Sequence, residues 1–291
     1  MRVAILGCGY IGLALSTRLV SAGHDVIGVR RSAPGKIEET GATAILGDLT
    51  EASTLERIPD VEAVVFAASS GGGDAATARR IYVDGLDGAI AHFGNRETSP
   101  EHFVYTSSTG VYGDHEGGWV DEDTPIDPQT AKAEVLAEAE RIARNASQLD
   151  GTVARIAGIY GPGRWGIERY VDRPVTEGYR NHIHRDDVAG AIAHLLTAGT
   201  DDHDLVLLVD DEPVDRFAFA DWLAEQLGVE PAKKRTVEER LSEEDLSERA
   251  ARRIRTSKRC DNTRLRSLGY TFTYPTYREG YARAVADYSD N

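Results

Sequence analysis

Short apolar runs alternate with amphipathic stretches along most of the chain. A run of about four to eight apolar residues between turn residues is typical of a buried strand, and a period of about 3.6 residues is typical of a helix. We expect strands at residues 3–6, 25–29, 43–46, 61–68, 102–106, 152–157 and 205–209, and helices at 13–22, 36–40, 51–57, 75–93 and 217–227, with two more after Pro128 and Asp187. This alternation predicts an α/β fold with a doubly wound parallel sheet.

The tightest turn in this pattern joins the first expected strand to the first helix, and its sequence is Gly7-Cys8-Gly9-Tyr10-Ile11-Gly12. Gly7 would make the turn, Gly9 would let the backbone approach a pyrophosphate, and Gly12 would let the helix pack closely on the strand. The unpaired N–H groups and the dipole at the helix N-terminus favour an anion there. The segment therefore predicts a Rossmann-type dinucleotide site formed by Gly7, Gly9, Tyr10, Ile11 and Gly12.

The residues after the second expected strand indicate which dinucleotide binds. An acidic residue at this place would hydrogen-bond the ribose 2′-hydroxyl of NAD, whereas the chain has Arg30, Arg31 and Ser32. A planar guanidinium can donate two hydrogen bonds to a 2′-phosphate. We therefore expect NADP as the cofactor. NAD stays open as an alternative, because two arginines after a strand can also be plain surface residues.

Polar residues follow several other expected strands, and ligands of such sheets lie outside the carboxyl ends of the strands. The carboxylate of Asp48, after the third strand, could accept a hydrogen bond from adenine or could cap the next helix. The hydroxyls after the fifth strand are suited to hydrogen-bond a substrate carbonyl or alcohol. We expect these residues to border the cofactor: Asp48, Leu49, Ala67, Ala68, Ser69, Thr106 and Ser107.

Composition and charge restrict the partners of the chain. The 48 acidic and 33 basic residues give a net charge of −15, which repels nucleic acids and anionic membranes. The small number of lysines also suits a salt-rich cytoplasm, where screening weakens self-repulsion, so we hypothesise a halophilic protein. The two cysteines, Cys8 and Cys260, form neither a disulfide framework nor a CxxC motif. We expect a cytoplasmic protein with a small-molecule substrate, no bound metal, and no nucleic-acid or membrane partner.

The chain divides into two parts by pattern. We expect residues 1–161 and 182–210 to form the dinucleotide-binding domain, and residues 162–181 and 211–291 to form a smaller C-terminal substrate lobe. Opposite charges alternate densely from residue 230 to 259, which is typical of a solvated helix or loop. The basic patch from Arg252 to Arg259 would more often pair with neighbouring carboxylates than bind a substrate phosphate.

These motifs together resemble the extended short-chain dehydrogenase/reductase superfamily, which includes nucleotide-sugar epimerases and dehydratases. The resemblance covers nearly the whole chain, and it lies in the glycine turn and in residues 47–49, 107–113, 155–163, 182–188 and 265–281. It implies that Arg30, Arg31 and Asp48 hold the adenosine half of the cofactor and that residues 67–69 pass along its ribose. It also implies that Ser108 is the catalytic serine and that residues 160–163 close over the nicotinamide.

One motif of the superfamily is missing from this chain. The superfamily uses Tyr-x-x-x-Lys, in which the lysine lowers the tyrosine pKa so that the tyrosine exchanges a proton with the substrate. If Lys132 is the family lysine, Pro128 takes the place of the tyrosine; in the other register, Thr130 and Glu134 replace the pair. The chain thus resembles the atypical branch of the superfamily. Groups that could protonate the oxygen instead are Tyr160, Tyr112, His182, His184 or a water beside Ser108.

Two functions are consistent with this sequence. The first is an NAD(P)-dependent oxidoreductase or epimerase that exchanges a hydride between the nicotinamide and a carbonyl or hydroxyl carbon of a sugar-like substrate, which could be a nucleotide sugar. Its candidate catalytic residues are Ser108, Lys132 and Tyr160. The alternative is an NAD(P)-binding sensor or interaction protein with reduced catalysis. A monomer and a homodimer are equally consistent with the sequence.

Overall fold

Seven parallel strands form the centre of the molecule. A computed structural model describes residues 1–291 except 72, 147–148, 199–203, 243–245 and 290–291. The strand order is β12-β7-β5-β4-β1-β2-β3. The strands are β1 (Arg2–Leu6), β2 (Asp25–Arg30), β3 (Thr43–Leu46), β4 (Ala63–Phe66), β5 (His102–Ser108), β7 (Gly151–Ile156) and β12 (Leu205–Leu208). The expected doubly wound α/β sheet is confirmed.

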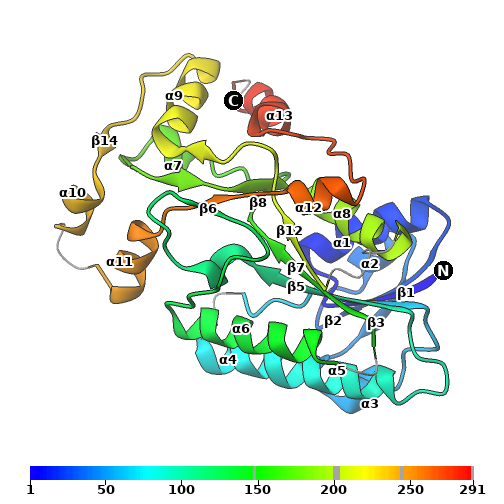
Figure 1. The fold of residues 1–291 in the computed structure, drawn as a ribbon. Coiled ribbons are helices and arrows are strands. Elements are labelled where there is room, and N and C mark those ends of the chain that lie inside the picture. The colour runs from blue at the N-terminus through cyan, green and yellow to red at the C-terminus, as the bar shows by residue number, and fades with distance from the viewer. Residues whose placement is uncertain (72, 147–148, 199–203, 243–245, 290–291) are drawn as a thin grey trace.

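Helices cover both faces of this sheet (Figure 1). On one face, α1 (Tyr10–Ser21) packs against α8 (Arg185–Ala198). On the other face lie α4 (Ala75–Arg79), α5 (Gly85–Gly94) and α6 (Ala131–Arg144), and the short helices α2 (Gly35–Glu38) and α3 (Ala52–Leu55) connect the outer strands. Because both faces are covered, strands such as β1 and β4 are apolar and buried throughout most of their length.

Several element boundaries differ from the sequence-based expectation, and two of them concern the region around β4 and the helix that follows it. The strand expected at 61–68 is limited to β4, because Ala68 leaves the ladder and packs against the backbone of Gly7. The helix expected at 75–93 contains a π-helical turn, η1 (Arg80–Asp84), between α4 and α5. In this turn the phenol oxygen of Tyr82 accepts a hydrogen bond of 3.1 Å from the backbone N–H of Ser70. The interruption thus ties the helix to the carboxyl end of β4.

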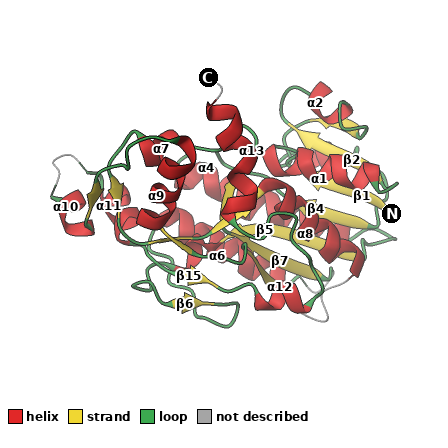
Figure 2. Ribbon diagram, turned by 90° about the horizontal axis from the view of Figure 1, so that it is seen from above, coloured by secondary structure: helices red, strands yellow, loops and turns green. Residues whose placement is uncertain are grey.

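Short strands join distant parts of the chain around the carboxyl ends of the sheet. β8 (Gly158–Tyr160) pairs with β11 (His182–His184), and β6 (Trp119–Val120) pairs with β15 (Arg259–Cys260). β9 (Val175–Thr176) pairs with β14 (Lys234–Arg235), and β10 (Tyr179–Arg180) pairs with β13 (Val214–Asp215). Figure 2 shows β6 and β15 side by side, away from the main sheet. These pairings bring the C-terminal third of the chain next to the loops after β5 and β7.

The apolar interior has a large and a small cluster. The large one surrounds the sheet and includes Leu265 of α12 (Thr263–Ser267). The small one joins α7 (Glu168–Val171), α9 (Arg216–Leu227) and α13 (Tyr277–Ser289) and contains Tyr160, Phe219 and Tyr281. Outside both clusters lie α10 (Val237–Leu241) and α11 (Glu248–Arg255), within the charged stretch of residues 230–259. The division into a Rossmann domain and a smaller lobe stays a prediction.

Candidate functional site

The glycine turn has the shape that a dinucleotide needs. Gly7 has a φ of 91°, and a Cβ there would lie 2.3 Å from Cα of Ala68, so a larger residue does not fit. A Cβ at Gly12 would lie 3.1 Å from Cγ2 of Ile5, because α1 packs closely on β1. Gly9 has no such neighbour: the nearest described atom to its Cβ position is Gly7 O at 3.9 Å. Gly9 is also the N-cap of α1 and provides no capping side chain, so first-turn N–H groups stay available for an anion.

Tyr10 links this turn to a distant loop. Its hydroxyl donates a hydrogen bond of 3.0 Å to the carbonyl oxygen of Pro162, and the guanidinium of Arg164 lies 4.0 Å from the centre of its ring. The neighbouring Ile11 packs against the main apolar cluster. The structure thus brings together the glycine turn and the loop after β8, the segment that the resemblance assigns to the nicotinamide side.

The end of β2 carries a guanidinium nitrogen without a partner. Nη1 of Arg30 is buried and has no hydrogen-bond partner among the described residues. Arg31 and Ser32, which follow it, are exposed to solvent. An unsatisfied buried donor costs about 1 to 3 kcal/mol, and a phosphate oxygen would satisfy it. The residues at this place therefore fit a 2′-phosphate.

Asp48 already has partners within the chain. The N-cap of α3 is Glu51, so the interpretation of Asp48 as the helix cap is wrong. Its Oδ1 accepts a hydrogen bond of 3.0 Å from Thr50 N–H, and its Oδ2 accepts one of 2.8 Å from Arg80. Although burial opposes the change, these hydrogen bonds and the charge of Arg80 lower the pKa of Asp48. An acceptor role toward adenine stays a prediction.

The other expected cofactor residues lie at the carboxyl ends of the central strands. Leu49 is buried, Ala67 is half-buried, and Ala68 lies against Gly7. Ser69 is exposed, and its Oγ accepts a hydrogen bond of 3.2 Å from Gly71 N–H. The hydroxyl of Thr106 donates a hydrogen bond of 3.2 Å to the carbonyl oxygen of Phe66, and this bond connects β5 to β4. These residues form the rim between the glycine turn and the end of β5.

Ser107 and Ser108 point in opposite directions, as neighbours on a strand do. Ser107 is buried and donates a hydrogen bond of 2.6 Å to Glu140, which pairs with Arg155 at 2.7 Å. Ser108 is half-buried, and its Oγ accepts a hydrogen bond of 3.1 Å from Gly110 N–H at the 3-10 turn η2 (Thr109–Tyr112). Because a hydroxyl has one donor and two acceptor positions, Ser108 can still donate to a substrate oxygen.

A cleft with a volume of about 1030 Å³ opens beside Ser108. One wall consists of the end of β5 and the start of α6, with Thr130 and Ala133. The side chain of Thr130 caps α6 by accepting a hydrogen bond of 3.1 Å from Ala133 N–H, so its oxygen serves the helix. The opposite wall is built from the residues around α7, β10, β14 and α11.

Positive charge dominates the walls of this cleft. Nine cationic residues line it: Arg169, Arg173, Arg180, Arg216, Arg235, Arg240, Arg252, Arg253 and Lys258. No aspartate or glutamate occurs among its described lining residues, although the whole chain has a net charge of −15. Burial, together with the charges of Arg180 and Arg253, lowers the pKa of Arg216. A concave surface of one sign focuses its field on ligands of the opposite sign, so this cleft is suited to an anion.

Sequence reasoning found only part of this cationic surface. In the sequence, only the basic patch from Arg252 to Arg259 indicates a cationic surface. Such a patch is expected to pair with neighbouring carboxylates more often than to bind a phosphate. Arg169, Arg173 and Arg216 are separated along the chain and belong to no motif. Strand pairs such as β9 with β14 bring these residues to one cavity, and that pairing cannot be deduced from residue spacing.

The two further catalytic candidates lie outside the described lining of the cleft. Lys132 is half-buried on the first turn of α6, where its Nζ lies 3.4 Å from Gly71 O and 5.8 Å from the centre of the Tyr82 ring. Tyr160 is fully buried and stacks on Tyr281 with 4.6 Å between the ring centres. Burial, with the charge of Asp210, raises the pKa of Tyr160, so its phenol holds its proton more tightly.

The histidines and Tyr112 also point into the interior. His182 is fully buried, and both of its ring nitrogens have no hydrogen-bond partner among the described residues. Burial, with the charge of Arg180, holds the pKa of His182 well below 6.5. Nδ1 of His184 accepts a hydrogen bond of 3.2 Å from the backbone N–H of Asp186. The hydroxyl of Tyr112 donates a hydrogen bond of 2.5 Å to the carbonyl oxygen of Asp121. His184 and Tyr112 thus form hydrogen bonds to the backbone, and a proton-donor role for any of the three residues stays a prediction.

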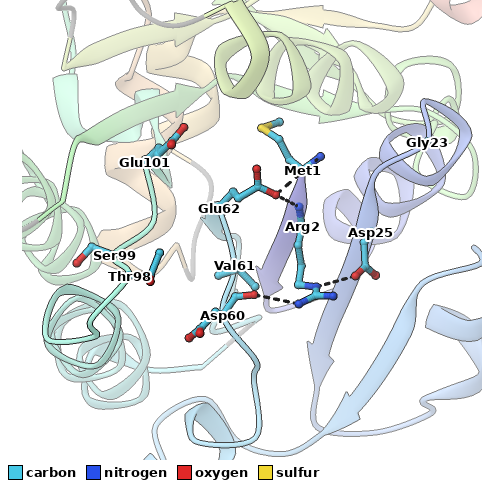
Figure 3. Close-up of a pocket in the computed structure, with 10 residues that line it drawn as sticks. All are labelled: Met1, Arg2, Gly23, Asp25, Asp60, Val61, Glu62, Thr98, Ser99 and Glu101. Carbon is cyan, nitrogen blue, oxygen red and sulfur yellow. Dashed lines mark hydrogen bonds and ion pairs between the residues drawn. The ribbon is translucent and has the colours of Figure 1, made fainter.

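A smaller pocket of about 410 Å³ lies at the amino ends of β1, β2 and β4, opposite the cleft. Figure 3 shows Arg2 reaching Asp25 and Asp60, with Glu62 beside the backbone of Arg2. Nε of Arg2 lies 2.6 Å from Oδ2 of Asp25. The backbone N–H of Arg2 donates a hydrogen bond of 2.7 Å to Oε2 of Glu62. Arg2 and Asp25 therefore pair with each other, and the amino group of Met1 lies 4.0 Å from Glu62.

Two searches of the described residues found no further kind of site. No group of three or more His, Cys, Asp or Glu residues among them could hold a metal ion. None of the described helices combines the length and apolar character needed to cross a membrane.

Known proteins share this architecture. The model of the NAD dependent epimerase/dehydratase family matches residues 3–207. Protein YeeZ of Escherichia coli strain K12 is 30% identical over 287 residues, which cover 94% of this chain and 96% of YeeZ. A proposed NAD-dependent epimerase/dehydratase from Methylobacillus flagellatus is 30% identical, with a TM-score of 0.78 and coverage of 99% and 98%. Human epimerase family protein SDR39U1, solved with NADPH, has the same fold at 17% identity, a TM-score of 0.79 and full coverage of both chains (100%).

Proposed function

The chain belongs to the NAD-dependent epimerase/dehydratase family, and from this premise we propose that it is an NADP-dependent oxidoreductase or epimerase of an anionic, sugar-like substrate. The cationic cleft beside Ser108 carries the proposal. Cations gathered around one cavity attract an anion that enters it. A sugar phosphate or a nucleotide sugar would supply that anion and would present a carbonyl or hydroxyl carbon to Ser108.

The glycine turn and the end of β2 would hold the cofactor. First-turn N–H groups of α1, next to Gly9, would receive the pyrophosphate, and the unpartnered Nη1 of Arg30 would donate to a 2′-phosphate. The bound nicotinamide supplies or accepts the hydride. The protein contributes orientation, because Ser108 and the cationic walls fix both ends of the substrate.

Cofactor binding tests the first half of the proposal. Isothermal titration calorimetry with NADPH and with NADH should show tighter binding of NADPH to the wild-type protein. In Arg30→Ala the NADPH affinity should fall by about tenfold or more, because a charge-assisted hydrogen bond is lost, while the NADH affinity changes little. Arg144→Ala is a matched control, because its guanidinium pairs with Asp204 at 2.7 Å beside β12, at the other edge of the sheet. Equal affinities of the wild type for both cofactors would contradict the assignment of NADP.

Turnover tests the second half. NADPH oxidation should be followed against phosphorylated and unphosphorylated carbonyl sugars and against nucleotide sugars, in dilute and in molar salt. We expect activity only with the anionic compounds, and a KM that rises with salt because screening weakens the attraction to the cleft. Ser108→Ala should lower kcat without weakening NADPH binding. Faster turnover of the uncharged sugars would contradict the proposal that the cationic cleft binds the substrate.

A second function, an NADP-binding sensor, is favoured by one observation. The tyrosine of Tyr-x-x-x-Lys is absent, and Tyr160, which could replace it, is buried with a raised pKa. Tight NADPH binding together with no turnover of any anionic carbonyl compound would support this function over the enzyme.

A further inference from the structure

A buried amine lies on the wall of the cleft that contains Ser108. Lys258 is 6% exposed, and it lines the same cavity as Ser108 and Gly113. Resting on the proposed oxidoreductase function, we propose that the ammonium group of Lys258 exchanges the proton of the substrate oxygen, in place of the missing tyrosine. The proposal concerns the same cavity and adds the acid/base group that the function requires.

The position of Lys258 is fixed at both of its ends. Its Nζ donates a hydrogen bond of 3.0 Å to Gly113 O, the residue that closes the turn after Ser108. Its backbone oxygen accepts a hydrogen bond of 3.0 Å from Nδ2 of Asn181. An ammonium group has three donors, and Gly113 is its one hydrogen-bond partner among the described residues, so two donors remain for a ligand.

The surroundings of Lys258 also make proton release easier. Burial lowers its pKa most, and the positive charge of Arg216 lowers it further, while Asp114 and Cys260 oppose the change. The Cys260 thiol is itself desolvated, which raises its pKa to about 12, so it stays uncharged at neutral pH. A lysine with a lowered pKa is closer to the value at which general acid/base catalysis is efficient.

The chemical step balances with this residue. When a carbonyl is reduced, its C=O π bond opens, the carbon gains a hydride from the nicotinamide, and an O–H bond forms. The proton comes from an N–H bond of Lys258, whose electron pair stays on nitrogen, and solvent then protonates the neutral amine again. Ser108 donates a hydrogen bond to the same oxygen and keeps its own proton.

Other acids of the chain are less well placed. Tyr160 and Tyr112 are fully buried, and their hydroxyls face Thr276 O and Asp121 O. Burial raises the pKa of both phenols. Lys132 faces Gly71 O, outside the described lining of the cleft. Lys258 therefore combines access to the cleft with a pKa that is shifted toward neutrality.

Chemical labelling tests this inference without a substrate. Pyridoxal 5′-phosphate is an anionic aldehyde that forms a Schiff base with a neutral amine, and borohydride fixes the adduct for peptide mass mapping. We expect label on Lys258 near neutral pH and protection of this site by inorganic pyrophosphate. Lys258→Arg should lose that label, whereas Lys234→Arg should keep it, because Lys234 pairs with Asp221 on the surface. Label spread over the other lysines, with Lys258 unmodified, would overturn the proposal.

A pH profile tests the proton transfer itself. With the best anionic carbonyl substrate, Lys258→Met should lower kcat by about a hundredfold or more, the usual contribution of a general acid. Lys258→Arg keeps the charge and can still donate to Gly113 O, but an arginine does not release its proton. It should therefore stay folded, lose turnover, and lose the alkaline limb of the pH profile. Unchanged kcat and pH dependence in Lys258→Met would contradict the inference.

The two proposals fail in different ways. If NADPH does not bind, the proposed function fails, and the labelling of Lys258 still reports the state and the access of its amine. If NADPH binds and is oxidised, and Lys258→Met is as fast as the wild type, the proposed function stands and the role of Lys258 falls. Thermal melts of each variant separate loss of the proton donor from loss of the fold.

Discussion

The pockets at the two ends of the sheet differ in how their charges are arranged. At the amino ends, the guanidinium of Arg2 lies 2.6 Å from Asp25, and the amino group of Met1 lies 4.0 Å from Glu62. At the carboxyl ends, nine cations surround a cleft of about 1030 Å³ whose described lining has no carboxylate. The amino-end pocket of about 410 Å³ thus contains charges of both signs, whereas the charged residues in the described lining of the cleft are all cationic.

The two pockets thus differ in what their charged residues can do: opposite charges in contact stabilise the fold, whereas cations around a cavity can attract a ligand. Paired surface charges stabilise the fold slightly and leave little field for a ligand. Cations around one cavity attract a ligand of opposite charge, and such a ligand weakens their mutual repulsion. We call a charge balanced when an opposite charge lies in contact with it, and unbalanced when none does. Substitutions of both kinds, from the interior to the surface, test the comparison.

The largest effect should come from a balanced pair in the interior. The residues Arg155 and Glu140 are each 3% exposed, and the guanidinium of Arg155 also lies 4.7 Å from the ring centre of Tyr112. Arg155→Met would leave a buried carboxylate without its partner, so we expect a loss of about 3 to 5 kcal/mol of unfolding free energy. Urea denaturation followed by circular dichroism measures it.

A double variant is the control for this prediction. Arg155→Met combined with Glu140→Gln removes both charges, and it should recover a large part of the stability, because no ion stays buried alone. If the single and the double variants were equally unstable, the loss would come from packing rather than from charge.

The second effect concerns an unbalanced charge in the interior. Asp210 is 1% exposed, and its Oδ2 has no hydrogen-bond partner among the described residues. Burial, with the charges of Asp211 and Glu212, raises the pKa of Asp210 well above 3.8, so folding favours its protonated form. The stability that this proton provides is complete below the unfolded pKa and is lost as pH rises through the folded pKa. Asp210→Asn should therefore stabilise the protein at pH 7 by on the order of 1 to 3 kcal/mol and should have no such effect near pH 3.

Denaturation at several pH values measures this dependence. Asp60→Asn is the control, because Asp60 is 76% exposed and lies 3.5 Å from Arg96 in the amino-end pocket. It should change stability little at any pH. A loss of stability in Asp210→Asn at pH 7 would mean that the carboxylate has a favourable role in the fold.

The third effect should appear in binding rather than in stability. Arg173 is exposed on the wall of the cleft, and Arg173→Glu would place a negative charge there. We expect the affinity for inorganic pyrophosphate, measured by calorimetry at low salt, to fall by about tenfold, or about 1.4 kcal/mol. The same reversal at the opposite end, Arg2→Glu, should leave this affinity unchanged. An equal loss in both variants would indicate that net charge, not the cleft, attracts the anion.

The smallest effect belongs to the balanced charges on the surface. The side chains of Arg2 and Asp25 are 46% and 53% exposed, so solvent screens their attraction. Arg2→Ala should lower the unfolding free energy by about 0.2 to 1 kcal/mol, and molar salt should reduce this loss further. Thermal denaturation in low and high salt measures it, and a loss of several kcal/mol would show that the pocket has a larger structural role.

The sequence by itself determined the sheet and the glycine turn. Each strand of a parallel sheet covered on both faces must be apolar, so runs such as 3–6 are visible without knowledge of their partners. The positive φ of Gly7 and the contact of Gly12 with Ile5 are constraints within the first strand, turn and helix, so they leave a local motif. The resemblance to a family, carried by such motifs, was confirmed by the match over residues 3–207.

Only the tertiary structure decided the composition of the cleft. Ser108 comes from the sheet, Arg173 from the loop before β9, and Lys258 from the chain before β15, and short strand pairs bring them to one cavity. The tertiary structure also buries Tyr160 and Ser107, and it leaves Ser108 half-buried on the wall of the cleft. Charge and burial depend on which residues are neighbours in space, and residues more than a hundred positions apart leave no periodic signal in the chain.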